Sequence, residues 1–313
     1  ILGAGPAGMT AVVYSARKQL DVLVISDDIG GQAMWSSAIE NYLGFIMISG
    51  ADLVLKFDEH VRIFSVPQEF TRARHVSRHG GLFRVETEDD RVFHSRALIV
   101  ATGKSPKLLD VPGEKEFRGR GVVYCATCDG PLFAGKTVAV VGGGNSGLDA
   151  VVQMMKICPR VYLIDIESKP RADEVVVRQA REAPNVDILP NTCVNRILGE
   201  DFVTGIEIEN VDTGEKRTLD VDGVFIEIGL APNSACVQDL VRLNPIGEIP
   251  VDCAARTGVP GLYAAGDVTD VPEKQIIIAA GDGAKAALGA YSYIVRLPMG
   301  TADDWGPMPA LER

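Results

Sequence analysis

Short hydrophobic runs recur along the chain, and each is bounded by glycine or by polar residues. They are rich in valine and isoleucine and have no alternating polar positions, which is typical of strands buried on both faces of a sheet. The predicted strands are Val22–Ile25, Ala97–Ala101, Thr137–Val141, Val161–Ile164, Val224–Ile228 and Leu262–Ala265. Helical patterns lie between several of them, at Gly8–Gln19, Gly147–Ile157 and Gln275–Arg296. This alternation of strands and helices predicts an α/β fold.

Two other stretches alternate apolar with polar residues. Phe83–Phe93 does so around Glu88-Asp89-Asp90, and Val203–Leu219 does so around Asp212-Thr213-Gly214. Each pattern predicts an antiparallel hairpin that decorates its domain. The last residues, Pro298–Arg313, combine proline, glycine and paired acids, so we expect a loosely held end.

A strand that leads into a glycine-rich turn and a helix occurs twice, at Gly3–Gly8 and at Gly142–Gly147. The repeat predicts two Rossmann-like dinucleotide-binding domains. Gly261–Ala286 has no such start, and its turn suits closure of the first domain better than closure of the second. We therefore expect residues 111–234 to form a domain inserted into a discontinuous one, residues 1–110 and 235–313. The chain begins at Ile1, almost inside a motif, so we expect a few residues of a first strand to precede it.

The composition excludes several classes of protein. A hydrophobic fraction of 46% and a charged fraction of 23% allow a large core and exclude a disordered chain. The 31 basic and 42 acidic residues give a net charge of −11, which disfavours binding to nucleic acid or to an anionic membrane. No stretch approaches the ~18 apolar residues of a membrane span, and the start lacks the cationic region of a signal peptide. We expect a cytoplasmic enzyme.

Each glycine motif has the spacing that allows a tight turn, close approach to a pyrophosphate and close packing of helix on strand. After the second motif, a predicted strand ends in Asp165, with Glu167 two residues on. An acid at this distance binds the ribose diol of NAD, whereas a 2′-phosphate needs an arginine, and Arg171 is the nearest one. The sequence favours NADH and keeps NADPH possible. The alternatives are an ordinary glycine-rich turn and acids that merely face solvent.

The segment Tyr124-Cys125-Ala126-Thr127-Cys128-Asp129 contains two cysteines at CxxC spacing beside a carboxylate. This arrangement suits a reversible disulfide, and the acid could pass a proton to or from a sulfur or a flavin. The alternative is half of a zinc site, but no second pair has ligand spacing, so we expect no metal. The other cysteines are dispersed, at Cys158, Cys193, Cys236 and Cys253. A dithiol and a nicotinamide on one domain need a relay, which FAD on the other domain would supply.

Over essentially its full length the chain resembles the low-molecular-weight thioredoxin reductase family, with particular likeness to the flavoprotein component of alkyl hydroperoxide reductase. The matching stretches begin with Gly3-Ala4-Gly5-Pro6-Ala7-Gly8, Gly30-Gly31-Gln32, Glu40-Asn41, Ala101-Thr102-Gly103 and Cys125-Ala126-Thr127-Cys128-Asp129. They continue with Gly142-Gly143-Gly144-Asn145-Ser146-Gly147, Ile228-Gly229-Leu230-Ala231-Pro232-Asn233 and Ala265-Gly266-Asp267-Val268. The resemblance implies that the outer domain binds FAD and that the inserted domain binds NAD(P)H and carries the redox disulfide.

The motifs and the resemblance together give the expected site residues, of which Asp27, Asp165 and Glu167 come from the strand ends after the glycine motifs. Those expected around FAD are Gly3, Gly5, Pro6, Ala7, Gly8, Asp27, Gly31, Gln32, Asn41, Ala101, Thr102, Gly103, Gly266, Asp267, Lys274, Gln275 and Ile276. Those expected around the nicotinamide dinucleotide are Gly142, Gly144, Asn145, Ser146, Gly147, Asp165, Glu167 and Gly229. Cys128 would face the flavin, Cys125 would attack the disulfide of a partner, and Asp129 would be the catalytic acid.

Two departures from the family pattern matter. The NADPH-type members carry His-Arg-Arg where this chain has Asp165-Ile166-Glu167, which favours NADH. The hydroperoxide-reductase flavoprotein carries an N-terminal thioredoxin-like extension, and nothing of that kind precedes Gly3 here, so we expect an external carrier protein to take the electrons.

The leading interpretation is therefore an FAD-dependent thioredoxin-disulfide reductase, a homodimer as is usual in the family, that passes electrons to a thioredoxin or glutaredoxin-like protein. One alternative is a reductase of a peroxiredoxin system. Another is a dithiol oxidase of the same fold, which needs no nicotinamide. A nucleotide-sensing module is the alternative outside enzymology, and it would leave the CxxC pair without a purpose.

Overall fold

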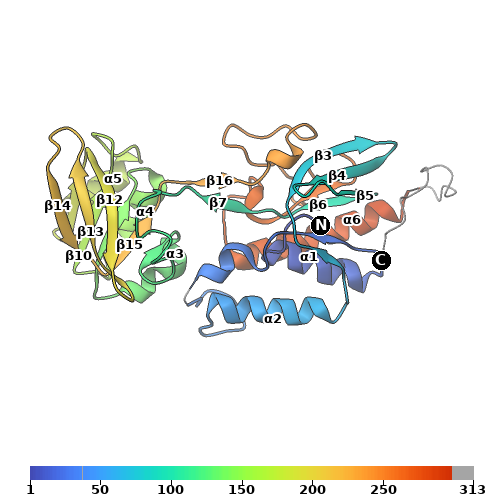
Figure 1. Ribbon diagram of the computed structural model, residues 1–313, viewed down its shortest axis with the longest axis horizontal. Helices are drawn as coiled ribbons and strands as arrows, with labels where there is room; N and C mark the ends of the chain where they lie inside the picture. The colour runs from blue at the N-terminus through green and yellow to red at the C-terminus, as the bar shows by residue number, and fades with distance from the viewer. Residues whose placement is uncertain (37, 298–313) are drawn as a thin grey trace. The chain divides into compact units, whose positions relative to one another are not determined.

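The computed structural model describes residues 1–36 and 38–297, in which the chain divides into two compact units (Figure 1). The first contains Ile1–Met34, Asp52–Ser105 and the chain from Ala231 onward, and the second contains Trp35–Ala51 and Pro106–Leu230. The predicted loose end, Pro298–Arg313, lies outside the described residues. Most of the second unit is thus a single stretch of chain between two parts of the first.

The chain passes between the units at the two ends of Trp35–Ala51 and again within two short strands that pair, β7 (Lys104–Pro106) and β16 (Leu230–Pro232). The crossings within β7 and β16 lie a few residues before the expected limits at residues 110 and 234, because strands of three residues leave no hydrophobic pattern to detect. The segment Trp35–Ala51 was expected in the first domain but packs with the second unit, where the ring of Trp35 lies 6.3 Å from that of Tyr124.

Five parallel strands form the central sheet of the second unit, in the order β11-β10-β9-β15-β8. Their bounds are β8 Val122–Val123, β9 Thr137–Val141, β10 Arg160–Ile164, β11 Val186–Leu189 and β15 Gly223–Ile226. The remaining elements are helices α3 Ala126–Asp129, η2 Gly130–Phe133, α4 Asn145–Met154 and α5 Glu174–Glu182, and the antiparallel strands β12 Thr192–Gly199, β13 Val203–Asn210 and β14 Lys216–Asp220.

Alternate side chains of β9 lie on opposite faces of this sheet. Val138 and Val140 belong to a core shared with helices α4 and α5, whereas Ala139 and Val141 belong to a core shared with β12 and β13. Because both faces are covered, every position of the strand is apolar or small, as the continuous hydrophobic run predicted. The predicted hairpin, β13 and β14, is thus part of a layer that covers one face of the sheet.

The first unit repeats this plan. Parallel strands β1 Val24–Ile25, β2 Gln68–Glu69, β6 Leu98–Val100 and β17 Leu262–Ala264 form its sheet, with Leu2 bridging β1 and β6. The other elements are α1 Pro6–Arg17, α2 Gly50–Arg62, α6 Ile276–Ile294, the short helices η1 Gly31–Trp35, η3 Ala235–Val237 and η4 Gly266–Val268, and the antiparallel strands β3 Ala73–His79, β4 Leu82–Thr87 and β5 Val92–Ser95. Val76 and Phe83 of this antiparallel layer cover one face of the sheet.

Helices α1 and α6 cover the other face and lie side by side (Figure 1). Gly283 of α6 permits this approach, because a Cβ there would collide with the backbone of Ala7. The six predicted strands, the three predicted helices and the two hairpins are all present, and the predicted fold class is confirmed. Within residues 1–36 and 38–297, no helix has the length and apolar character that crossing a membrane requires.

Candidate functional site

The segment Cys125–Cys128 of the second unit, here called the redox turn, begins two residues after the end of β8. Cys125 and Cys128 form the predicted disulfide, with their Cα atoms 5.3 Å apart, and α3 begins between them, at Ala126. The backbone N–H of Cys128 donates to Cys125 Sγ at 3.1 Å. An N–H aimed at this sulfur would stabilise negative charge on it after reduction.

Asp129 is buried at the end of α3, next to this disulfide. Ser36 donates its hydroxyl to Asp129 Oδ1 at 2.7 Å. Burial raises the pKa of Asp129 to about 6, and the Ser36 hydrogen bond opposes part of that rise. The carboxyl group can therefore hold a proton close to neutral pH, as a general acid must. Ser36 was not a predicted residue, since no local pattern connects it with a residue so far along the chain.

Aromatic rings and a guanidinium group stand beside the same turn. The guanidinium of Arg118 lies over the rings of Trp35 and Tyr124, at 4.4 and 5.4 Å from their centroids. The Tyr124 hydroxyl donates to Glu114 at 2.9 Å. Burial is the main cause that raises the pKa of Tyr124 to about 12, so this hydroxyl stays protonated. Cation–π contacts and a hydrogen bond thus hold the Tyr124 side chain, next to Cys125 in the chain, and no sequence pattern indicated this arrangement.

The second glycine turn follows β9 in the same unit. Gly142 has φ of +121°, and a Cβ on it would meet the carbonyl group of Glu227. A Cβ on Gly147 would collide with the Gly142 carbonyl oxygen, whereas Gly144 has no atom within 4 Å of that position. The turn thus leaves space beside its middle glycine, Gly144, and packs closely at Gly142 and Gly147, as a pyrophosphate-binding turn requires. Asn145 and Ser146 open α4 and are at least partly exposed.

Asp165 lies directly over this turn, and it is only 4% exposed. Its Oδ1 accepts the Glu167 N–H at 3.3 Å, while its Oδ2 is buried without a hydrogen-bond partner in the described part of the chain. A Cβ on Gly143 would collide with this carboxylate. A buried acceptor without a partner is costly, and a ribose hydroxyl would supply the missing donor. The residues present therefore fit a dinucleotide.

Two other residues belong to the surroundings of this turn. Arg171 donates its backbone N–H to the Gly143 carbonyl at 2.7 Å, and its exposed guanidinium lies 3.5 Å from the Glu167 carboxylate. Gly229 has φ of +104°, and its carbonyl accepts the Lys107 N–H at 3.0 Å. Glu167 thus partly neutralises the nearby arginine that a 2′-phosphate could use.

The first glycine turn, in the first unit, has the same construction. A Cβ on Gly8 would collide with the Gly3 carbonyl oxygen, and Gly5 has open space beside it. Pro6 begins α1, and Ala7 is buried on that helix. Three further predicted residues are brought to this turn: Gly31 beside Gly5, Ala101 beside Gly3, and Gly266 beside Ala7. The open middle of this turn fits a second dinucleotide.

Asp27 lies at the end of β1 and is exposed. Its Oδ2 accepts from Arg72 Nε at 2.6 Å. Gln32 donates its side-chain N–H to the Lys104 carbonyl at 2.7 Å. Asn41 lies in the segment Trp35–Ala51, which belongs to the second unit. Asp27 and Gln32 are therefore hydrogen-bonded to other residues of the first unit.

Lys104, Lys274 and Glu248 form an ionic group in the first unit, and its two lysines act electrostatically on Asp267. Glu248 Oε1 accepts from Lys104 Nζ at 2.6 Å and lies 3.2 Å from Lys274 Nζ. Burial raises the pKa of Asp267, although the two lysines oppose the rise. The family resemblance indicated Asp267 and Lys274, but the sequence analysis missed Lys104 and Glu248, which pair across 144 residues. Gln275 and Ile276 stand at the start of α6, and Thr102 donates to the Asn233 carbonyl beside Gly103.

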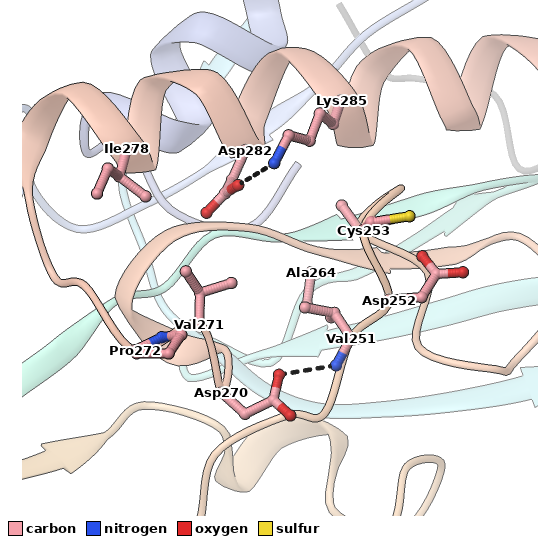
Figure 2. A pocket seen from close by; sticks show the side chains of 11 residues that line it. Val251, Asp252, Cys253, Ala264, Asp270, Val271, Pro272, Ile278, Asp282 and Lys285 are labelled. Atoms are coloured by element: carbon pink, nitrogen blue, oxygen red, sulfur yellow. Dashed lines mark hydrogen bonds and ion pairs between the residues drawn. The ribbon is translucent and has the colours of Figure 1, made fainter.

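A pocket of about 310 Å³ lies elsewhere in the first unit (Figure 2). Helix α6 supplies Ile278, Asp282 and Lys285 from one side, and loops supply Asp252, Cys253 and Asp270, among others, from the other side. No predicted site residue lines it. Asp282 Oδ1 accepts from Lys285 at 3.0 Å, and its Oδ2 is buried without a partner among the described residues.

Comparison with known proteins gives consistent matches. The family model described as pyridine nucleotide-disulphide oxidoreductase matches residues 1–283. The alkyl hydroperoxide reductase of Staphylococcus epidermidis has a subunit that is 41% identical over 297 residues, 95% of this chain and 59% of its own length. The corresponding Pseudomonas putida protein is 41% identical over 300 residues, 95% of this chain and 58% of its own. The chain thus spans about three fifths of the length of these relatives.

Solved structures match over nearly the whole chain. Thioredoxin reductase from Streptococcus pyogenes has a TM-score of 0.89 at 36% identity, covering 94% of this chain and 96% of its own. Thioredoxin reductase from Giardia duodenalis has a TM-score of 0.86 at 29% identity, covering 94% of this chain and 97% of its own.

Proposed function

The chain belongs to the pyridine nucleotide-disulphide oxidoreductase family, and from this premise we propose that it reduces a disulfide of a thioredoxin-like protein with electrons from NADH. Family membership makes it an enzyme and implies a nicotinamide and a flavin cofactor. One observation carries the proposal: the Cys125–Cys128 disulfide and a glycine turn that fits a dinucleotide lie in one unit, and Glu227 joins the two, because its carboxyl accepts the Ala126 N–H and its carbonyl lies against Gly142. A module that only bound nucleotides would not need that disulfide.

On the nicotinamide side, Asp165 and Glu167 favour NADH. The unpartnered oxygen of Asp165 would accept a ribose hydroxyl, and both carboxylates would repel a 2′-phosphate. The other residues proposed to hold this dinucleotide are Gly142, Gly144, Asn145, Ser146, Gly147 and Gly229.

On the flavin side, the proposed ligand is FAD, held by the first glycine turn with Gly31, Ala101, Gly266 and Asp267. When bound, a flavin supplies two-electron chemistry between a nicotinamide and a disulfide. The ionic group of Lys104, Lys274 and Glu248 would fix Asp267 and the start of α6.

At the dithiol, Cys125 is the proposed attacking sulfur. Its thiolate forms a bond to one sulfur of the partner's disulfide, and the other partner sulfur leaves and takes a proton. Cys128 then attacks Cys125, which re-forms their disulfide and releases the reduced partner with a second proton. Two electrons and two protons thus pass to the partner, and Asp129 is placed to donate or accept a proton.

A second candidate is a reductase of a peroxiredoxin system, and the relatives that belong to alkyl hydroperoxide reductases favour it. In that case, too, the carrier is a protein with a redox disulfide. A dithiol oxidase is less supported, because it would not need the intact second turn with Asp165 above it. We also propose that the protein works in the cytoplasm as a homodimer.

Anaerobic titration tests the proposal. We expect the purified protein to be yellow, with one FAD per chain, and NADH to bleach the visible flavin band. Cys125→Ser should keep this bleaching and lose electron transfer to thioredoxin. Turnover of thioredoxin by Cys125→Ser at the wild-type rate would assign the reaction to another thiol pair. Bleaching by dithiols but not by NADH would instead support a dithiol oxidase.

A further inference from the structure

Glu227 follows the last residue of β15 and touches both candidate sites of the second unit. Its N–H donates to the Val141 carbonyl at 2.9 Å, and its own carbonyl stands against Gly142. Its side chain reaches the redox turn, where Oε1 accepts the Ala126 N–H at 3.2 Å. A single residue therefore joins the glycine turn to the peptide that follows Cys125.

Ala126 is held from two sides. Gln153 of α4 donates its side-chain N–H to the Ala126 carbonyl at 3.0 Å, opposite the hydrogen bond from the Ala126 N–H to Glu227. Only one of these two side chains can ionise. Gln153 therefore provides a matched comparison, since it holds the same residue without adding a charge.

The surroundings of Glu227 favour its neutral form. Burial is the largest effect and raises its pKa to about 7, the Ala126 N–H opposes this rise, and the negative charge of Asp149 adds to it. The ionisable side chains on the elements around it are Asp149 of α4, Asp129 at the end of α3 and Tyr124 before α3, and reduction of the disulfide adds Cys125 and Cys128. Strand β9, Thr137–Val141, contributes no ionisable side chain. Glu227 thus changes charge within the range of pH in which the enzyme would work.

We propose that the Glu227 carboxyl, through the Ala126 peptide, positions the redox turn and controls how readily the Cys125 sulfur becomes a thiolate. The inference rests on the proposed function, in which Cys125 attacks the partner. Reduction of the disulfide breaks the bond between the two sulfurs and takes up two electrons from the nicotinamide donor, with two protons when both products are thiols. Cys125 must then lose its proton to attack. When Glu227 is ionised, its negative charge beside the Ala126 peptide disfavours a negative charge on the Cys125 sulfur. The neutral acid has no such effect.

The variant Glu227→Gln separates the charge from the hydrogen bond. Its amide oxygen can still accept the Ala126 N–H but cannot ionise. At about pH 8, where wild-type Glu227 is charged, we expect Cys125 of this variant to be alkylated roughly three- to tenfold faster, as a change of about half to one pKa unit gives. Below about pH 6 the two proteins should react alike, because the wild-type acid is then neutral.

The measurement is the alkylation rate of Cys125 by iodoacetamide, read from the mass of its peptide, over about pH 5.5 to 9. The full chain is used in a Cys128→Ser background, so that the disulfide cannot re-form and no nicotinamide is needed. Asp149→Asn should move the Glu227 inflection to lower pH, because it removes a charge that raises the Glu227 pKa. Gln153→Ala should keep the wild-type inflection, whatever it does to the absolute rate.

Identical pH profiles for wild type and Glu227→Gln would overturn the inference. The same change of pH profile in Gln153→Ala would also overturn it, because the hydrogen bonds that hold Ala126, and not the charge of Glu227, would then control the alkylation of Cys125. The proposed function fails on a different result, namely no electron transfer from NADH to thioredoxin by the wild type, even if alkylation depends on Glu227.

Discussion

The two glycine turns have almost the same backbone geometry, but the acids that follow them in the sequence, Asp27 and Asp165, differ in burial and in hydrogen-bond partners. Gly3 and Gly142 both have positive φ, +97° and +121°. In each turn the third glycine, Gly8 or Gly147, packs against the carbonyl of the first, and the middle glycine faces open space. This shared geometry is why one sequence pattern identifies both turns.

The acids after the two turns differ in burial and in partners. Asp165 is 4% exposed and keeps one carboxylate oxygen without a hydrogen-bond partner among the described residues. The side chain of Asp27 is 42% exposed, and its carboxylate is paired with Arg72. A buried oxygen without a partner is ready to accept a ligand hydroxyl, whereas an exposed paired one gains less from it. The two units thus share the geometry of the glycine turn and differ in the burial and pairing of the acid that follows it.

The largest expected effect comes from the feature that the turns share. In Gly147→Ala the new Cβ would collide with the Gly142 carbonyl, so α4 must shift. We expect a loss of about 1 to 3 kcal/mol in the free energy of unfolding and of on the order of 100-fold in NADH affinity. Gly8→Ala should act in the same way on flavin retention. Urea unfolding and cofactor titration measure both.

The control for these variants is Gly281→Ala. Gly281 is exposed on α6 with no atom within 4 Å of the new Cβ, so alanine should be neutral or stabilise by up to about 1 kcal/mol. Unchanged NADH affinity in Gly147→Ala would contradict the assignment of this turn to the nicotinamide dinucleotide.

The second prediction compares the same substitution at the two acids, Asp165 and Asp27. Asp165→Asn removes a buried charged acceptor, and we expect the Kd for NADH to rise roughly 10- to 100-fold, as the loss of a hydrogen bond to a charged group gives. Asp27→Asn should weaken flavin retention by no more than about threefold, because Arg72 already occupies this carboxylate. Equal losses at the two sites would show that burial does not distinguish them.

The third effect concerns the choice of coenzyme. We expect wild type to prefer NADH over NADPH by about tenfold or more in kcat/KM, because Asp165 and Glu167 repel a 2′-phosphate. Glu167→Arg removes one repelling charge and frees Arg171 from its ion pair, so the preference should shift toward NADPH by about tenfold. Glu182→Arg makes the same charge change at the end of α5 and should leave the preference unchanged. An NADPH preference in wild type would reject this account.

The sequence could predict what depends on local pattern. Runs such as Thr137–Val141 predict a strand buried on both faces, and the spacing of Gly142, Gly144 and Gly147 predicts the tight turn between β9 and α4. The CxxC spacing predicted the disulfide, with half of a zinc site as the alternative, and the Cα atoms lie 5.3 Å apart, within the range of a disulfide.

It could not predict contacts between residues far apart in the chain. Ser36 meets Asp129 across 93 residues, and Glu227 meets Ala126 across 101. No periodicity marks either pair, because each arises only when two segments with separate patterns are folded together. The same holds for Asp27, whose exposure and whose partner 45 residues on, Arg72, are properties of the folded unit.

The smallest expected effect tests whether the ion pair of Asp27 behaves as a surface interaction. Its side chains are 42% and 64% exposed, so Asp27→Asn should lower the free energy of unfolding by no more than about 1 kcal/mol. At about 1 M salt the difference should vanish, because screening reaches within a few ångströms. A double-mutant cycle with Arg72→Gln, followed by urea unfolding at low and high salt, isolates the pair. A coupling above about 2 kcal/mol, or one that salt leaves unchanged, would mean that Asp27 is as shielded from solvent as Asp165. The difference between the two acids would then lie only in which of them has a partner, and their burial would explain nothing.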